Sequence, residues 1–515
     1  MKQRQKNKKF RGILRKLSAF LAIAVFALTL SGCSGRNTTG RGSVTLYWWR
    51  SQEDANKQIL ETMITKFQQD NPSIKVKVVL KNPDTYLKEA TEALASNQTI
   101  ENAPDIMSVN AYDLPKVAAQ LAPAPDNLFA DPKAKVKDTR NAVEVAKEQL
   151  VPAAYKAVVL NDPKTASSKL YGLPIGIDSL VLFRNREILS DAATNLKTEN
   201  KLGQQYSAEE LKILKKKIQD PALTWAALAE IIPLIKVQDG AQVSRAAISL
   251  GSSINVERSY DILQTIMMQN GTQLVSGELD SATFNQARAG AAASANPGEK
   301  ALGFYLRFSN PNDPIYTWNN DMPNSFDAFK NEQSAMMIHY GSAYNILINE
   351  AKSLKNKIDI QPLPQAVDPK AATSTNQVKT MAKMWVETAP SAKGDVKRQQ
   401  AAWRFINYVT SKGSSSYLSA MKMSSALKKG TDKAKFAALT SQKTTADLWF
   451  KGADSMAVDK IFISAIDDAA TGKKNPQEAL NSAATSTTKI LQSSKIKWST
   501  AAATSAVSQE VNTGE

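Results

Sequence analysis

The chain has 515 residues, of which 43% are hydrophobic and 22% charged, and this length favours at least two domains or lobes. A single Cys and a single His exclude a disulfide framework, a Cys-rich metal site and a multi-His metal site. The formal net charge of +17 would suit a nucleic-acid-binding protein, so the position of that charge along the chain decides its meaning.

The N-terminus has the pattern of a secretory signal. Residues 1–16 carry eight Lys and Arg and no acidic residue, and an apolar run of 14 residues, Leu17–Leu30, follows. A membrane-spanning helix needs about 20 residues, so we predict a signal peptide over residues 1–32. Its removal lowers the formal charge from +17 to +9, and we therefore expect no nucleic-acid partner.

Cys33 stands directly after Leu30, Ser31 and Gly32, which resembles the lipidation motif of bacterial lipoproteins. This resemblance implies a lipidated Cys33 with a flexible tether over 33–43, and thus an extracytoplasmic protein anchored to the cell membrane. The alternatives are an ordinary signal peptide with an incidental Cys, or a retained membrane anchor.

Strands alternate with helices after the tether. Hydrophobic patterns predict strands over 44–49, 74–80 and 104–109, and helices over 53–69 and 84–96. This alternation favours a mainly parallel sheet, in which ligands bind beyond the carboxyl ends of the strands. Candidate ligand contacts at these ends are Trp48, Trp49, Arg50, Asn110 and Tyr112.

An ordered set of segments resembles the extracellular solute-binding lipoproteins of ABC importers, in the branch that includes maltose- and other sugar-binding proteins. The strongest match is Tyr171–Asp178 followed by Leu180–Asn185. The other matching segments are Leu46–Trp49, Phe67–Val76, Pro104–Ile106, Gln120–Pro123, Leu223–Trp225, Ser325–Ile338, Ile358–Pro364 and Ala401–Tyr408. The sequence departs from the family pattern at two helix or turn positions, Ala226–Ala227 and Asn331–Glu332.

The resemblance implies a two-lobed α/β periplasmic-binding-protein-like fold, with discontinuous lobes joined by a hinge and a ligand held between them. By matching segments, lobe I comprises 44–160 and 339–382, and lobe II comprises 161–338 and 383–500. The remaining residues, 501–515, read as a disordered tail, and 190–220 as a charged surface insertion. A carbohydrate ligand, a membrane permease as partner and a monomeric state follow from the same resemblance.

A sugar site needs aromatic rings for the apolar ring faces and polar side chains for the hydroxyls. Trp48 and Trp49 point to opposite faces of a strand, so one of them belongs to the core. Trp225 and Trp403 read as core residues, and the lone His339 as a structural residue near the hinge. The predicted ligand contacts are Trp48, Trp49, Arg50, Tyr112, Asp178, Trp318, Asn319, Tyr340, Gly341 and Trp385.

Motifs of the common enzyme classes are absent from the sequence, so we predict a binding protein without a catalytic residue, cofactor or metal. Two alternatives stay open: a binding protein for a polyamine, a peptide or a metal chelate, and a surface lipoprotein with an adhesive or glycan-hydrolysing role.

Overall fold

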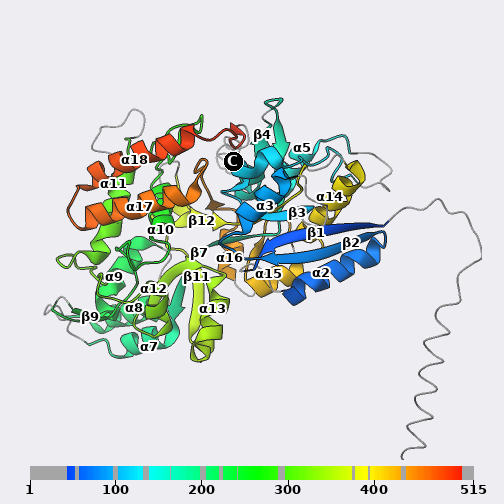
Figure 1. The fold of residues 1–515 in the computed structure, drawn as a ribbon. Helices are drawn as coiled ribbons and strands as arrows, with labels where there is room; N and C mark the ends of the chain where they lie inside the picture. The colour runs from blue at the N-terminus through cyan, green and yellow to red at the C-terminus, as the bar shows by residue number, and fades with distance from the viewer. Residues whose placement is uncertain are drawn as a thin grey trace, which may run out of the picture. The chain divides into compact units, whose positions relative to one another are not determined.

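A computed structural model describes residues 43–52, 57–96, 103–130, 138–162, 164–197, 205–219, 224–240, 242–287, 296–373, 377–391, 395–430 and 437–500. Apart from residue 43, these belong to the unit Val44–Glu515 (Figure 1). The predicted signal peptide, Cys33, the tether up to residue 42 and the tail at 501–515 lie outside the described residues.

The first sheet contains the strands predicted near the N-terminus. Within the described residues it has five strands in the order β2-β1-β3-β13-β6. The β1 strand lies parallel to β2 and β3, as predicted, whereas β13 is antiparallel to β3 and β6. The bounds are β1 Val44–Ser51, β2 Ile74–Lys81, β3 Ile106–Asn110, β6 Leu173–Pro174 and β13 Trp385–Thr388.

The second sheet is built around β7, a strand whose ten residues are all buried. In the described part of the chain, its main path runs β10-β7-β12-β15, and β11 and β14 also pair with β7. All partners of β7 are antiparallel to it. The bounds are β7 Gly176–Asn185, β10 Met336–Tyr340, β11 Ile358–Pro362, β12 Thr380–Lys383, β14 Ser424–Ser425 and β15 Ala446–Asp447.

Helices and two hairpins surround the sheets. The helix α14 packs on β1, β6 and β13, while α16 packs on β7 and β11, and α10, α11, α17 and α18 pack together (Figure 1). The hairpins are β4 Val159–Asn161 with β5 Ser168–Leu170, and β8 Val237–Asp239 with β9 Gln242–Arg245. The helices are α2 Lys57–Asp70, α3 Tyr86–Ala95, α4 Leu114–Val117, α5 Ala142–Gln149, α6 Pro152–Val158, α7 Arg186–Thr194, α8 Ala208–Gln219, α9 Trp225–Ile235, α10 Ser259–Gln269, α11 Pro297–Leu306, α12 Ser325–Lys330, α13 Ala343–Glu350, α14 Val396–Thr410, α15 Ser415–Met421, α16 Ala437–Gln442, α17 Ser455–Ala470 and α18 Pro476–Gln492.

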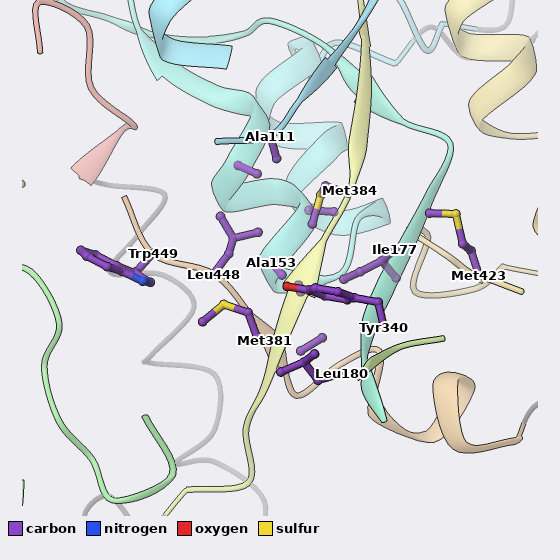
Figure 2. Close-up of a cluster of buried hydrophobic side chains, with 14 of the residues drawn as sticks. Ala111, Ala153, Ile177, Leu180, Tyr340, Met381, Met384, Met423, Leu448 and Trp449 are labelled. Carbon is purple, nitrogen blue, oxygen red and sulfur yellow. The ribbon is translucent and has the colours of Figure 1, made fainter. Parts of the chain in front are cut away.

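Within the described residues the chain passes between the two sheets three times, twice through a single buried residue and once, from β13 to β14, through a stretch that contains α14 and α15. Ile175 joins β6 to β7, and Met384 joins β12 to β13. The Met384 carbonyl accepts a hydrogen bond of 3.0 Å from the Ala111 amide, directly after β3. Figure 2 shows Met384 towards Ala111, with Tyr340 beside Ile177. These apolar side chains make the crossing continuous with the core on both sides.

Strand pairing divides the chain differently from the predicted lobe boundaries. The segment 339–382, assigned to lobe I, contains β11 and β12, which pair with β7 in the second sheet. The strand β13, assigned to lobe II, lies in the first sheet between β3 and β6. The difference arises because β10 runs antiparallel to β7 and stays in the second sheet, so the return to the first sheet comes later, at Met384.

Gly172 belongs to the segment with the strongest family resemblance, Tyr171–Asp178. Its lack of a side chain lets the chain before β6 lie close to β13. A Cβ built on Gly172 would come within 2.4 Å of Val386 Cγ1 and 2.8 Å of the Glu387 carbonyl oxygen. We expect Gly172→Ala to lower the free energy of unfolding by about 1–3 kcal/mol, measured by urea denaturation. The control is Gly303→Ala on α11, where the added Cβ meets nothing within 4 Å, and it should not destabilise the protein. Equal stability of the two variants would contradict this explanation.

Candidate functional site

Trp48 and Arg50 are fully buried and belong to one polar network around Glu387. The Trp48 indole Nε1 donates to Glu387 Oε2 at 2.6 Å, and Arg50 Nη1 donates to Glu387 Oε1 at 2.5 Å. Ser108 Oγ donates to the same carboxylate, and Arg50 Nη2 donates to the Tyr417 hydroxyl. We call Trp48, Arg50, Ser108, Glu387 and Tyr417 the Glu387 network. These bonds join five buried side chains beside the first sheet.

Trp49 lies on the other face of β1, as the strand period predicts, and is also buried at 5% exposure. The Lys81 ammonium lies 3.9 Å from the centre of its ring, and the Tyr86 hydroxyl donates to the Trp49 carbonyl. Both tryptophans of β1 are therefore already covered by neighbouring protein groups. Trp225 and Trp403 are buried at 4% and 2% exposure, so their prediction as core residues is confirmed.

Asp178 and Gly341 meet beside the crossing from the first sheet to the second. Asp178 is 3% exposed, and its Oδ1 accepts from the Gly341 amide at 2.9 Å while Oδ2 accepts from the Ser342 amide at 3.2 Å. Burial raises the pKa of Asp178, against the hydrogen bonds from Ser342 and Gly341 and the charge of Lys383. In this arrangement the carboxylate ties β7 to the turn that precedes α13.

Trp318 and Asn319 lie in the loop between α11 and α12 and have partners of their own. Trp318 is fully buried, and its Nε1 donates to Asn255 Oδ1 at 2.8 Å. Asn255 Nδ2 in turn donates to the carbonyls of Asn319 and Met322, and Asn319 Nδ2 donates to the Tyr316 hydroxyl. These bonds hold the loop that carries Trp318 against the segment before α10.

Trp385, the first residue of β13, is half-buried and lies opposite Asn110, the last residue of β3. Its position is one residue after the crossing at Met384. Trp385 and Asn110 therefore stand at the carboxyl end of β3, where the sequence predicts ligand contacts.

Tyr112 belongs to a second polar cluster, centred on Lys451, and Tyr340 is bonded to one member of this cluster. The Lys451 ammonium lies 2.5 Å from Asp459 Oδ1 and 3.7 Å from Asp261 Oδ1, and 4.5 Å from the centre of the Tyr112 ring. The Tyr340 hydroxyl donates to Asp261 Oδ2 at 3.0 Å. We call the set Tyr112, Tyr260, Asp261, Trp449, Lys451 and Asp459 the Lys451 cluster.

The Lys451 cluster receives residues from both sides of the crossing. Tyr112 follows β3 of the first sheet, and its hydroxyl donates to Met381 Sδ of β12 at 3.2 Å. The other members come from the first turn of α10, from the segment after β15 and from the start of α17. Next to them, Arg258 has φ +60°, a strained backbone for a residue other than glycine, and its guanidinium lies 5.7 Å from the centre of the Tyr340 ring.

Burial is the largest single influence on the pKa values in this cluster. It raises the pKa of Asp459 to about 6, against the attraction of Lys451. Burial alone would lower the pKa of Lys451, but attraction to Asp459, Tyr112 and Asp261 outweighs burial, and the net shift is upward. Burial likewise raises the pKa of Tyr112. Lys451 therefore stays an ammonium at neutral pH.

The raised pKa of Asp459 predicts a pH dependence of stability. As the pH falls from about 6 towards the ordinary value near 3.8, the folded protein binds this proton before the unfolded chain does. We therefore expect the stability of the wild type relative to Asp459→Asn to increase as the pH falls through this window. As the pH rises again through about 6, this added stability should be lost. The measurement is the difference between the two unfolding midpoints at a series of pH values.

The control for this prediction is Asp468→Asn on the same helix. Hydrogen bonds from Lys473 and Lys474 lower the pKa of Asp468, so its contribution should shrink as the pH falls, with the opposite sign. A wild-type advantage over Asp459→Asn that does not change with pH would contradict the raised pKa.

Sequence reasoning missed Lys451, Asp261 and Asp459, which are far apart in the chain. The signal that could have found them is the segment Trp449–Lys451, where an aromatic pair and a lysine directly follow a short strand. A hollow of about 300 Å³ lies elsewhere, between α17 and α18, and its lining contains small and charged residues but no aromatic ring. We therefore do not place a solute there.

The described residues contain no group of three or more His, Cys, Asp or Glu that could hold a metal ion. In the same part of the chain, no helix is both long enough and apolar enough to cross a membrane.

Comparisons with known proteins agree on one family and one fold. The family model described as bacterial extracellular solute-binding protein matches residues 51–415. A maltodextrin-binding protein of Bacillus subtilis is 27% identical over 190 residues, which is 37% of this chain and 39% of that relative.

Two solved structures show the likeness of fold. The cyclic alpha-maltosyl-1,6-maltose binding protein of Arthrobacter globiformis has a TM-score of 0.64 at 13% identity, covering 88% of this chain and all of the other. UgpB of Mycobacterium tuberculosis in complex with glycerophosphocholine has a TM-score of 0.60 at 15% identity, covering 87% and 99%. At such identity the likeness concerns the fold, and it confirms the predicted periplasmic-binding-protein-like architecture. Its two sheets are mixed, whereas the sequence pattern predicted a mainly parallel sheet.

Proposed function

Because the chain belongs to the bacterial extracellular solute-binding proteins, we propose that it is the solute-binding component of an ABC importer and that its solute is a carbohydrate. This is a family of binding proteins, in agreement with the prediction that the chain is not an enzyme. Carbohydrate as the solute class is supported by the maltodextrin-binding relative and by the sugar-binding Arthrobacter structure.

The observation that carries the proposal is the Lys451 cluster. It combines aromatic rings with charged and hydroxyl groups at a place where the loop after β3 meets the second sheet. Four residues are half-buried and can stack on a sugar ring or bond its hydroxyls. They are Tyr112 and Tyr260 of the cluster, the adjacent Arg258, and Trp385, which lies opposite Asn110 at the end of β3. We propose these four residues as solute contacts.

The predicted contacts keep different roles in this proposal. Tyr340 and Gly341 would position the site through Asp261 and Asp178 rather than touch the solute. Trp48, Arg50 and Trp318 would stabilise the lobes through their buried hydrogen bonds.

Capture would work by differential affinity. A solute that touches groups on both sides of the crossing binds the closed arrangement of the lobes more tightly than the open one, and so shifts the population towards it. A membrane permease would then recognise the closed form. Micromolar affinity corresponds to about 8 kcal/mol, which a few stacked rings and satisfied hydroxyls can supply.

A ligand screen tests the solute class. Purified residues 34–515 are heated with maltotriose, cyclic maltodextrins and tagatose, and in parallel with spermidine and glycerophosphocholine. We expect the thermal midpoint to rise with at least one carbohydrate and calorimetry to confirm binding. A shift with spermidine or glycerophosphocholine and none with any sugar would replace the carbohydrate proposal with a non-sugar solute, for which the UgpB complex is the precedent. Cleavage of a glycan would instead support the surface-hydrolase alternative.

We also propose that Cys33 carries the lipid anchor, on the sequence motif alone. Cells grown with labelled palmitate should yield a labelled wild-type protein in the membrane fraction. The Cys33→Ser variant should appear unlabelled, and labelling of that variant would refute this anchor.

A further inference from the structure

The side chain of Lys451 is 1% exposed, although a lysine so deeply buried usually requires special compensation. Its ammonium lies 2.5 Å from Asp459 Oδ1 and 3.7 Å from Asp261 Oδ1. Two carboxylates thus supply the opposite charge, and the closer one accepts a hydrogen bond.

Three aromatic rings complete the surroundings of this ammonium. The ring centres lie 4.5 Å away for Tyr112, 5.6 Å for Tyr260 and 5.9 Å for Trp449. Aromatic faces within about 6 Å attract a cation through the ring quadrupole, and several of them form the recognition site for ammonium groups. Rings together with carboxylates are therefore the chemistry that binds an alkylamine.

Some walls of this arrangement are held in place by bonds that do not involve Lys451. The Trp449 indole donates to Gln264 Oε1 at 3.0 Å, and Asp261 accepts from the Tyr340 hydroxyl at 3.0 Å. The Tyr260 hydroxyl accepts from Arg258 Nη1 at 2.9 Å. Because these bonds remain when the lysine side chain is shortened, the walls should persist around the space it leaves.

We propose that the Lys451 cluster is an ammonium cage filled by the protein's own lysine, and that Lys451 thereby excludes amine-bearing solutes from the site. That this cage faces the solute rests on the proposed function. The cage itself rests only on the distances given above. Because the lysine already pairs with the carboxylates, the groups left for a solute are ring edges and hydroxyls. These groups favour an uncharged, hydroxyl-rich solute.

The test is chemical rescue of Lys451→Ala by small amines. Removing the ammonium leaves the buried carboxylate of Asp261 and the half-buried carboxylate of Asp459 without the Lys451 charge, so the thermal midpoint of the purified protein should fall by roughly 3–5 °C. Ethylammonium chloride near neutral pH should restore the midpoint in a saturable way and leave the wild type unchanged. Tetramethylammonium should restore it less, because it cannot donate a hydrogen bond to Asp459.

Two variants separate a cage from a general salt or charge effect. In Lys451→Met the neutral side chain fills the space, so this variant should lose stability and gain nothing from ethylammonium. Lys156→Ala removes a lysine paired with the carboxylate of Asp447, which lies close to Lys379 as well, and it should show no saturable rescue. Sodium chloride at equal ionic strength is the reference for all four proteins.

Absence of saturable rescue in a folded Lys451→Ala variant would overturn the cage, and so would binding of ethylammonium to the wild type. If Lys451→Ala does not fold, ethylammonium present during refolding provides the same test, because only a cage would recover folded protein under that condition. These outcomes are independent of the carbohydrate screen: failure of the screen removes the proposed solute, whereas failure of rescue removes the cage.

Discussion

Replacing Glu387 with alanine is expected to lower the free energy of unfolding by about 3–5 kcal/mol. The side chains of Arg50 and Glu387 are both 0% exposed, so the variant leaves a fully buried guanidinium without its carboxylate. Trp48 Nε1 and Ser108 Oγ lose their acceptor in the same step. Urea denaturation followed by tryptophan fluorescence measures the effect.

Two further variants test whether the loss of stability arises because the charges are buried. Glu92→Ala removes an exposed partner of Lys88, and it should cost less than about 0.5 kcal/mol. The double variant Arg50→Met, Glu387→Leu removes both buried charges and should recover part of the loss. If Glu387→Ala were as stable as Glu92→Ala, the Glu387 network would not be the electrostatic centre of the first lobe.

Replacing Tyr112 with alanine is expected to weaken solute binding roughly 10- to 100-fold, which corresponds to about 1.4–2.8 kcal/mol. The reason is that Tyr112 is the half-buried ring that the first sheet contributes to the Lys451 cluster. Calorimetry with the sugar identified in the screen measures the dissociation constant.

Tyr112→Phe keeps the ring and loses only the hydroxyl contact to Met381, so its affinity should stay within about threefold of the wild type. The control is Tyr47→Ala on β1, which removes another half-buried tyrosine with a lysine, Lys77, near its ring. It should leave the affinity unchanged. Wild-type affinity in a folded Tyr112→Ala variant would remove this residue from the proposed contacts.

The strands and helices of the first sheet could be predicted from the sequence because their apolar patterns are local. The alternation in Ile74–Leu80, for example, specifies a strand whatever its partner, and β2 forms there. The direction of β10 relative to β7 is a long-range property, and the assignment of 339–382 depended on it. The assignment of 339–382 to a lobe therefore could not be made from local patterns and needed the strand pairing.

The candidate site likewise contains residues that a local sequence pattern marks and residues that only the fold brings together. Tyr112 could be predicted because it follows a recognisable strand, and β3 ends two residues before it. Trp48 and Arg50 follow the same rule, yet Glu387, more than 330 positions further along, draws them into the core. Neither that carboxylate nor the convergence of Asp261, Lys451 and Asp459 has a local pattern that marks it.

The position of β13 also constrains how the protein can be made. Glu387 and Ser108 are bonded across 279 positions of sequence, so a nascent chain lacks the strand that completes the first sheet until residues 385–388 have been synthesised. Until then the bonds of Arg50 and Ser108 to Glu387 cannot form, and β3 lacks the neighbouring strand β13. We expect this late completion to keep the growing chain unfolded long enough for export, and to make N-terminal fragments that end before residue 385 prone to aggregation.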